Sequence, residues 1–147
     1  MSEVVAIRVA GQDFGLPVIQ VRDVLRHWQL TPVPLAPRAV AGLLNLRGHI
    51  VTAIDLRLRL GLPSEGGRSE ATLVVVENGS ELYALVVDRV GDVLRMEERR
   101  LETAPVGLDP GWRAVASAVY TTDTGFIVLL DIARLLDIAP PARRAAS

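Results

Sequence analysis

The chain has 147 residues, of which 50% are hydrophobic and 22% are charged, a composition that suits one packed domain or two very small lobes. Sixteen basic and 17 acidic residues give a formal net charge of -1, so no global field attracts nucleic acid or an anionic membrane. All the basic residues are arginine and cysteine is absent, which excludes Schiff-base lysines, lysine-containing phosphate loops, disulfides and thiolate chemistry.

The first predicted element is a β-hairpin that occurs twice. Residues 4–9 are apolar and rich in β-branched side chains, residues 11–13 have turn chemistry, and residues 14–16 resume the apolar pattern. The same arrangement returns 69 positions later, where residues 73–77 and 83–87 flank an Asn-Gly turn. The chain therefore contains a duplicated hairpin.

The repeat continues beyond the hairpins. Residues 21–26 match residues 90–95 at the same offset of 69, with five of six identities. Residues 50–56 resemble residues 126–132 at an offset of 76, and each copy ends on a strand, an aspartate and a predicted short helix. Duplicated units of this kind cannot bury their apolar faces alone. The sequence therefore predicts an all-β fold of two small barrels packed together.

The whole chain, residues 1–147, is predicted to form a single domain. Its expected parts are lobe one at about residues 1–61, a polar, Gly-rich connection at 62–70, lobe two at about 71–139 and a frayed tail at 140–147. The N-terminus lacks the features of a signal peptide, and no apolar run approaches the roughly 20 residues that span a bilayer. The predicted location is the cytoplasm, without direct membrane insertion.

Motifs of catalysis and metal binding are missing from the sequence. His27 and His49 do not stand at ligand spacing with another histidine or a cysteine, and there is no nucleophile elbow or dinucleotide glycine motif. Asp55 and Asp131 occupy equivalent places, but each follows a strand and precedes a predicted helix, so their predicted role is that of a helix N-cap. We expect no enzyme, no catalytic residues, no metal and no cofactor.

Residues 41–57, Ala-Gly-Leu-Leu-Asn-Leu-Arg-Gly-His-Ile-Val-Thr-Ala-Ile-Asp-Leu-Arg, resemble the signature of CheW-like domains. The resemblance extends from about residue 4 to residue 138 and includes residues 14–18, 31–34 and 85–88. It implies two pseudo-repeated, five-stranded, SH3-like β-barrel lobes with short helices. It also implies an adaptor that couples methyl-accepting chemoreceptors to the histidine kinase CheA in signalling arrays.

The partners implied by this resemblance are the regulatory domain of CheA and the cytoplasmic tips of the receptors, which would recruit the chain to membrane-associated arrays. By the same resemblance, Val21 and Asp23 match a receptor-binding groove between the lobes, with Val86 and Val87 on its other wall. From the residues alone, Asp23 is expected to be solvated or paired with a neighbouring arginine, and partner contact is the alternative.

The kinase contact is implied by the Asn-Leu-Arg-Gly motif. Arg47 matches its arginine, which is associated with coupling and partner contacts, while Asn45 and Gly48 are expected to shape the turn around it. Gly42 matches a position near the kinase-facing end of the first lobe. A structural ion pair is the alternative interpretation of Arg47.

Two other functions remain open from the sequence. The first is a CheW-like coupler of a different motility or sensory pathway, because these residues do not identify the receptor. The second is a small-barrel nucleic-acid or ligand-binding module, which would need a basic groove with stacking aromatic side chains. Aromatic residues make up 4% of the chain and the charge is balanced, so we expect no nucleic-acid partner.

Overall fold

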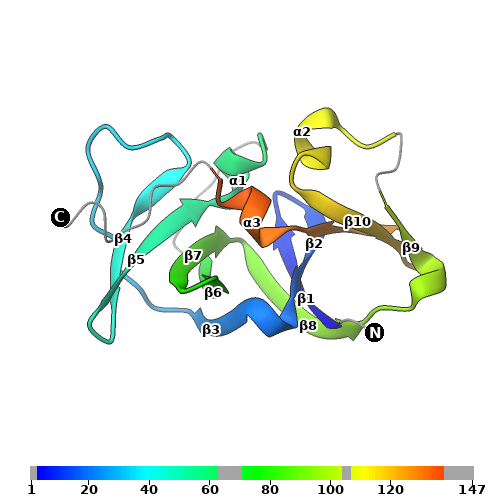
Figure 1. The fold of residues 1–147 in the computed structure, drawn as a ribbon, viewed down its shortest axis with the longest axis horizontal. Helices are drawn as coiled ribbons and strands as arrows, with labels where there is room; N and C mark the ends of the chain where they lie inside the picture. The colour runs from blue at the N-terminus through cyan, green and yellow to red at the C-terminus, as the bar shows by residue number, and fades with distance from the viewer. Residues whose placement is uncertain (1–2, 63–70, 104–106, 138–147) are drawn as a thin grey trace.

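The computed structural model describes residues 3–62, 71–103 and 107–137. The predicted connection at 62–70 lies outside the described residues except for Leu62, and the predicted tail at 140–147 lies wholly outside them. The described chain forms two lobes that lie side by side along the long axis of the molecule, with short helices at their junction (Figure 1).

The first sheet is built from the two ends of the chain, and we call its lobe the split lobe. Within the described residues it has six strands in the order β8-β1-β2-β11-β10-β9. Its strands are β1 (Glu3–Val9), β2 (Gln12–Pro17), β8 (Arg89–Arg95), β9 (Leu101–Glu102), β10 (Ala116–Thr121) and β11 (Phe126–Leu130).

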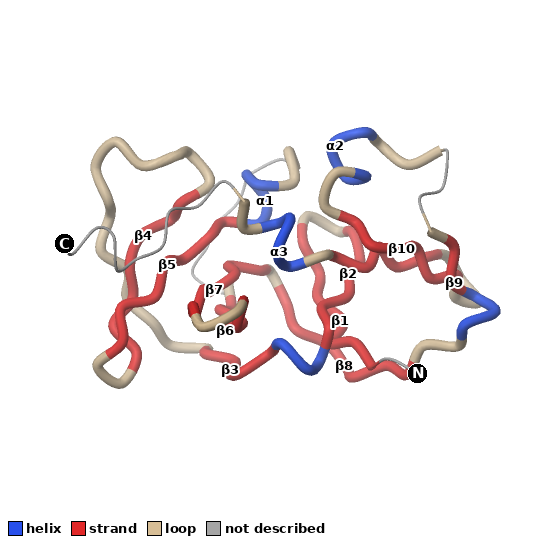
Figure 2. Tube along the Cα trace, in the orientation of Figure 1, coloured by secondary structure: helices blue, strands red, loops and turns tan. Residues whose placement is uncertain are grey.

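The second sheet is built from the middle of the chain, and we call its lobe the inserted lobe. Its order is β3-β6-β7-β5-β4. Its strands are β3 (Val21–Leu25), β4 (Val40–Leu46), β5 (His49–Asp55), β6 (Thr72–Asn78) and β7 (Glu81–Val87). Figure 2 shows that strands dominate both lobes, and that the helices are single short turns between them.

The helical turns connect strands or follow them. They are η1 (Val18–Gln20), α1 (Leu56–Arg59), η2 (Glu98–Arg100), α2 (Pro110–Arg113) and α3 (Ile132–Leu135). The Asp55 carboxylate accepts hydrogen bonds from the backbone N–H groups of Arg57 and Leu58 in α1, and the Asp131 carboxylate accepts one from the N–H of Arg134 in α3. The predicted N-cap role of both aspartates is confirmed, because the side chains satisfy N–H groups that have no partner within a helix.

The two sheets do not follow the predicted boundaries of the lobes. The hairpin β1–β2 was expected to complete lobe one, but it pairs with β8 and β11, while β6–β7 pairs with β3 and β5. Among the described residues, the inserted lobe therefore comprises residues 21–62 and 71–87, and the split lobe combines residues 3–17 with residues 89–103 and 107–137. The reason is that the two hairpins are copies of one another, so each has the pattern needed to complete either barrel.

The fold class itself agrees with the prediction. When each strand of the inserted lobe is replaced by its copy, the strand order β3-β6-β7-β5-β4 becomes β8-β1-β2-β11-β10. This is the strand order of the split lobe, which has the two-residue β9 as an additional strand. The parallel strand pairing is repeated as well, because Val128 pairs with Phe14 in the split lobe and Thr52 pairs with Tyr83 in the inserted lobe. Phe14 and Tyr83 are equivalent at the offset of 69, and Thr52 and Val128 are equivalent at the offset of 76. The molecule is thus an all-β protein of two repeated lobes with short helices.

The lobes are joined by one cluster of buried apolar side chains, which we call the shared core. It contains Phe14 and Leu16 from the split lobe and Ile54 and Leu85 from the inserted lobe. The aromatic ring of Phe14 meets Trp112 edge to face, with ring centroids 5.4 Å apart. Because burial of apolar surface is the main favourable term in folding, the two lobes are expected to fold as one cooperative unit.

Candidate partner-binding surfaces

The β4–β5 hairpin carries Arg47 at its tip. Leu46 pairs with His49, so Arg47 and Gly48 form a two-residue turn. Both turn residues have positive φ, 52° for Arg47 and 87° for Gly48, as turns of type I′ require. The side-chain oxygen of Asn45 accepts a hydrogen bond from the Gly48 N–H at 3.0 Å. Asn45 and Gly48 therefore shape the turn, and 78% of the Arg47 side chain is exposed.

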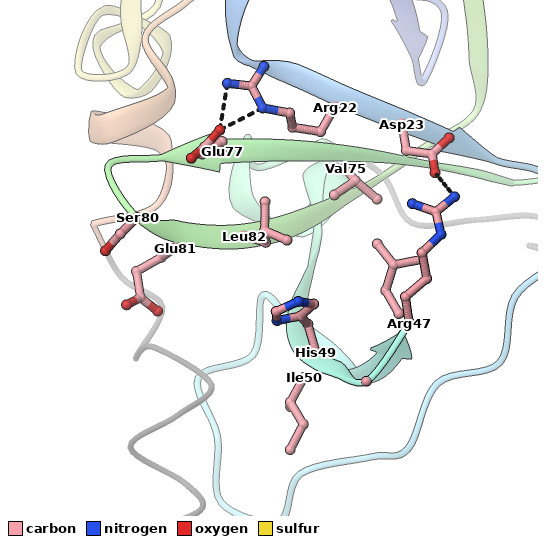
Figure 3. Close-up of a pocket in the computed structure, with 12 residues that line it drawn as sticks. Arg22, Asp23, Arg47, His49, Ile50, Val75, Glu77, Ser80, Glu81 and Leu82 are labelled. Atoms are coloured by element: carbon pink, nitrogen blue, oxygen red, sulfur yellow. Dashed lines mark hydrogen bonds and ion pairs between the residues drawn. The ribbon is translucent and has the colours of Figure 1, made fainter.

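Arg47 reaches from this turn to the edge strand β3. Its Nη2 lies 3.4 Å from Oδ2 of Asp23 (Figure 3). Oδ1 of Asp23 accepts a hydrogen bond from the Val24 N–H at 2.8 Å. An exposed ion pair of this kind contributes at most about 1 kcal/mol to stability, so its main effect is to orient the two side chains. The structure thus brings together two residues that the resemblance associates with different partners.

An open hollow of about 740 Å³ surrounds this ion pair. It is lined by β3, the β4–β5 turn and the β6–β7 hairpin, and a second ion pair joins Arg22 to Glu77 at 2.5 Å (Figure 3). The apolar side chain of Leu82 lies between this second pair and His49 of β5 (Figure 3). Opposite charges interspersed with apolar side chains suit contact with a polypeptide, which is read by complementary charge and shape.

The predicted groove residues do not form one open surface. Val21 is half-buried on β3 and packs against the shared core. Val86 and Val87 are both buried, because β7 is an inner strand whose two faces are covered. Val86 packs in the cluster that contains Leu44, and Val87 packs in the shared core. The predicted position of Val86 and Val87 on an open groove wall is therefore wrong. Both side chains are packed in the interior of the protein.

Gly42 is buried within the inserted lobe. A Cβ atom at this position would lie 2.7 Å from the carbonyl oxygen of Thr31. The backbones of Thr31 and Leu43 exchange two hydrogen bonds, of 2.9 and 2.8 Å. Gly42 therefore allows the segment before β4 to lie directly against that strand. Because Gly42 is buried, it could affect the binding of a partner only by changing the position of the segment that contains Thr31.

Sequence reasoning missed three exposed apolar side chains, Ile19, Val24 and Val93, which we call the apolar strip. Their exposed fractions are 80%, 37% and 56%. They lie on η1 and on the edge strands β3 and β8, which follow one side of the molecule across both lobes (Figures 1 and 2). The repeat could have pointed to Val24 and Val93, which are equivalent at the offset of 69, but not to Ile19, whose equivalent is the charged Asp88.

Two further properties of the described residues concern metal ligands and membrane-spanning helices. Within residues 3–62, 71–103 and 107–137, no three side chains of His, Asp or Glu gather where they could hold a metal ion. The helices in these ranges all lack the length and hydrophobicity that a membrane span requires. In the split lobe, a hydrogen bond to Asp123 raises the pKa of Arg100 above its usual value.

Sequence comparisons relate the chain to one family model and to several curated proteins. The family model described as the CheW-like domain matches residues 3–139. The chemotaxis protein CheW of Rhizobium meliloti (strain 1021) is 29% identical over 130 residues, which cover 88% of this chain and 84% of that protein. Protein FrzA of Myxococcus xanthus is 28% identical over 139 residues, which cover 94% of this chain and 87% of that protein.

A solved structure has the same architecture. The crystal structure of the scaffolding protein TtCheW from Thermoanaerobacter tengcongensis matches with a TM-score of 0.78 and 27% sequence identity. The match covers 88% of each chain. The similarity in sequence and the similarity in fold therefore both extend over most of the molecule.

Proposed function

The chain belongs to the CheW-like domain family, and we propose on this basis that it couples methyl-accepting chemoreceptors to the histidine kinase CheA in signalling arrays. Its relatives include proteins named as a chemotaxis protein and as a scaffolding protein. The chain is thus a chemotaxis adaptor without catalytic activity. It acts by holding its partners in a fixed geometry.

The observation that carries this proposal is that one small molecule has two surfaces of different chemistry. The apolar strip follows the edge strands β3 and β8 across both lobes. The hollow with Arg47 and Asp23 belongs to the inserted lobe alone and is rich in charge. Two surfaces that differ in this way suit an adaptor, because each can select its own partner.

The apolar strip is the proposed contact for the receptor. The cytoplasmic tip of a receptor would present an amphipathic helix, and such helices bind by laying an apolar face on an apolar surface. Burial contributes about 25 cal/mol per Å² before the costs of association, so a small strip gives moderate affinity. In an array, many such contacts act together at high effective concentration, and binding becomes strong. The proposed place of action is the cytoplasm, at membrane-associated receptor arrays.

The hollow around Arg47 is the proposed contact for the regulatory domain of CheA. Arg47 supplies an exposed guanidinium at the tip of a rigid turn, and arginine is enriched among the residues that dominate binding energy. Asn45 and Gly48 hold this turn, and Gly42 sets the position of the segment beside β4. Among these residues, we propose that only Arg47 contacts the kinase through its side chain.

The proposal predicts that the two surfaces can be inactivated separately. Val24→Asp places a charge in the apolar strip and is expected to weaken binding of a receptor cytoplasmic fragment by at least about tenfold, which is about 1.4 kcal/mol. Arg47→Ala is expected to weaken binding of the CheA regulatory domain by a similar factor. Isothermal titration calorimetry with each purified partner measures both effects, after circular dichroism has shown that the variants are folded.

Arg99→Ala is the matched control for Arg47→Ala, because Arg99 is equally exposed and pairs with a neighbouring carboxylate in the split lobe. Phe126→Asp is the control for Val24→Asp, because it replaces an exposed apolar side chain outside the strip. Both controls should bind as the wild type does. If folded wild-type protein binds neither partner, the coupling proposal is rejected. If Val24→Asp and Arg47→Ala each weaken both partners equally, the assignment of separate surfaces is rejected.

A second candidate is a coupler for a different motility or sensory pathway. The observation that favours it is the similarity to FrzA, which is as close in sequence as some of the CheW relatives. The same calorimetric measurement discriminates the two, with receptors and CheA-type kinases from each pathway of the source organism as ligands. Binding confined to the partners of a pathway other than chemotaxis would favour this second candidate.

A further inference from the structure

The described chain passes between its two sheets at two places. β2 ends at Pro17 in the split lobe and β3 begins at Val21 in the inserted lobe, with η1 between them. β7 ends at Val87 in the inserted lobe and β8 begins at Arg89 in the split lobe, so Asp88 is the single residue of the second crossover. A change in the angle between the lobes must therefore turn the backbone at η1 and at Asp88.

Asp88 is bonded to both lobes. Its Oδ2 accepts a hydrogen bond from the Ala10 N–H at 2.8 Å, and its own N–H donates to the Arg8 carbonyl at 3.0 Å, both in the β1–β2 hairpin of the split lobe. Arg57 of α1, in the inserted lobe, donates to the same carboxylate through two nitrogens. Nε lies 3.0 Å from Oδ1, and Nη2 lies 2.6 Å from Oδ2.

The geometry of the ion pair between Arg57 and Asp88 restricts the relative orientation of the two lobes. A forked, charge-assisted pair between a guanidinium and a carboxylate fixes distance and orientation together, and both side chains are partly buried. The shared core holds the lobes together, but apolar burial has no preferred direction. Arg59 adds a second link from α1 to the split lobe, because it donates to the carbonyls of Leu135 at 2.8 Å and Arg134 at 3.1 Å.

The internal repeat shows that the ion pair is not a by-product of the duplicated fold. At the offset of 69, the residue equivalent to Asp88 is Ile19, and at the offset of 76 the residue equivalent to Arg57 is Ala133. Neither equivalent residue carries a charge. The first crossover therefore has no copy of this pair, and its Ile19 belongs to the apolar strip instead.

We propose that Arg57 and Asp88 are positioning residues that set the angle between the lobes and thereby the spacing of β3 and β8. The part of this inference that concerns receptor binding rests on the proposed function, because the apolar strip spans both edge strands. A receptor segment that contacts both strands binds only molecules with the correct spacing. The proposed kinase contact lies within the inserted lobe and does not depend on the angle.

The angle can be measured without any partner. The natural chain has no cysteine, so Ser80→Cys in the inserted lobe and Thr124→Cys in the split lobe provide two exposed sites for spin labels. Double electron–electron resonance then gives the distribution of distances between the lobes in the folded protein. We expect one narrow distribution for the labelled parent. Arg57→Gln or Asp88→Asn is expected to widen it about twofold, as more than one angle becomes populated.

Receptor binding supplies a second readout. The apparent Kd equals the intrinsic Kd divided by the fraction of molecules that are competent to bind, so a fall of that fraction to about a tenth raises the Kd for a receptor fragment about tenfold. The Kd for the CheA regulatory domain should stay within about twofold of the wild-type value, because its contact lies in one lobe. A reduction in stability alone would not separate the two partners in this way.

Arg8→Gln is the matched control, because it breaks the 3.2 Å ion pair between Arg8 and Asp13 within the split lobe and leaves the Arg8 carbonyl in place. It should leave the distances unchanged. If folded Arg57→Gln and Asp88→Asn both retain the parental distribution, the positioning role is overturned, even if their unfolding midpoints fall. Absence of receptor binding by the wild type would instead reject the proposed function, and the distances would still decide the role of the ion pair.

Discussion

Replacement of Phe14 by alanine is expected to lower the free energy of unfolding by about 3–5 kcal/mol. Phe14 is fully buried on β2, between β1 and β11, and its ring packs in the shared core against Trp112. Truncation would remove most of the apolar surface of the side chain and leave a cavity that rigid neighbouring strands cannot fill. Urea denaturation monitored by circular dichroism measures the loss.

The second phenylalanine of the chain supplies the control. Phe126 lies at the start of β11 with 48% of its surface exposed, so Phe126→Ala makes the same chemical change with little loss of packing. We expect it to cost less than about 1 kcal/mol. Equal losses for Phe14→Ala and Phe126→Ala would contradict the description of a core shared between the lobes.

Gly42→Ala is expected to destabilise the fold by about 1–3 kcal/mol, the usual cost of forcing extra volume into a packed site. The new Cβ atom would lie 2.7 Å from the Thr31 carbonyl oxygen and 3.1 Å from the Leu30 Cβ atom. A backbone oxygen cannot move aside without disturbing the two hydrogen bonds between Thr31 and Leu43. Because that segment would shift, binding of the CheA regulatory domain should weaken as well. Urea denaturation and calorimetry measure the two effects.

Gly91→Ala is the matched control for this substitution. A Cβ atom at Gly91 meets Ala6 at 3.5 Å or more, which is an ordinary van der Waals contact. The equivalent position in the other copy holds Arg22, so β8 should accept a side chain there. We expect a change within about 0.5 kcal/mol. A Gly42→Ala variant as stable as Gly91→Ala would show that the contact with Thr31 does not constrain the fold.

Local features of the fold were predictable because they depend on neighbouring residues. The Asn-Gly hairpin and the N-cap aspartates follow from backbone chemistry within a few positions, and the turn at Asn45 and Gly48 was implied by the resemblance of their motif to CheW-like domains. The structure places all of these elements close to where the sequence predicts them. The duplicated pattern also predicted two similar lobes, since each copy carries a full set of strands.

The partition of the chain into lobes could not be predicted in the same way. The pattern of residues 4–16 returns in residues 73–87, so it does not tell which barrel each hairpin completes. The misplacement of Val86 and Val87 has a different origin. The uninterrupted apolar run of β7 is typical of a strand that is buried on both faces, and that pattern argued against a groove wall.

An ion pair was among the interpretations of both Asp23 and Arg47, but that the two residues pair with each other could not be predicted from the sequence. The two residues are 24 positions apart and meet because β3 and the β4–β5 turn converge on the same hollow. The contact of Arg57 with Asp88 has the same character, since 31 positions separate the residues. Contacts of this kind depend on how the sheets are joined, which local propensity and periodicity do not encode.

The most direct test of the adaptor role is whether the chain binds both partners at once. Sedimentation velocity of a mixture of the chain, a CheA regulatory domain and a receptor cytoplasmic fragment measures this. We expect a species that sediments faster than either binary complex and contains all three proteins. If the kinase domain displaces the receptor fragment, so that only binary complexes form, the chain does not couple the two partners and the proposed function is wrong.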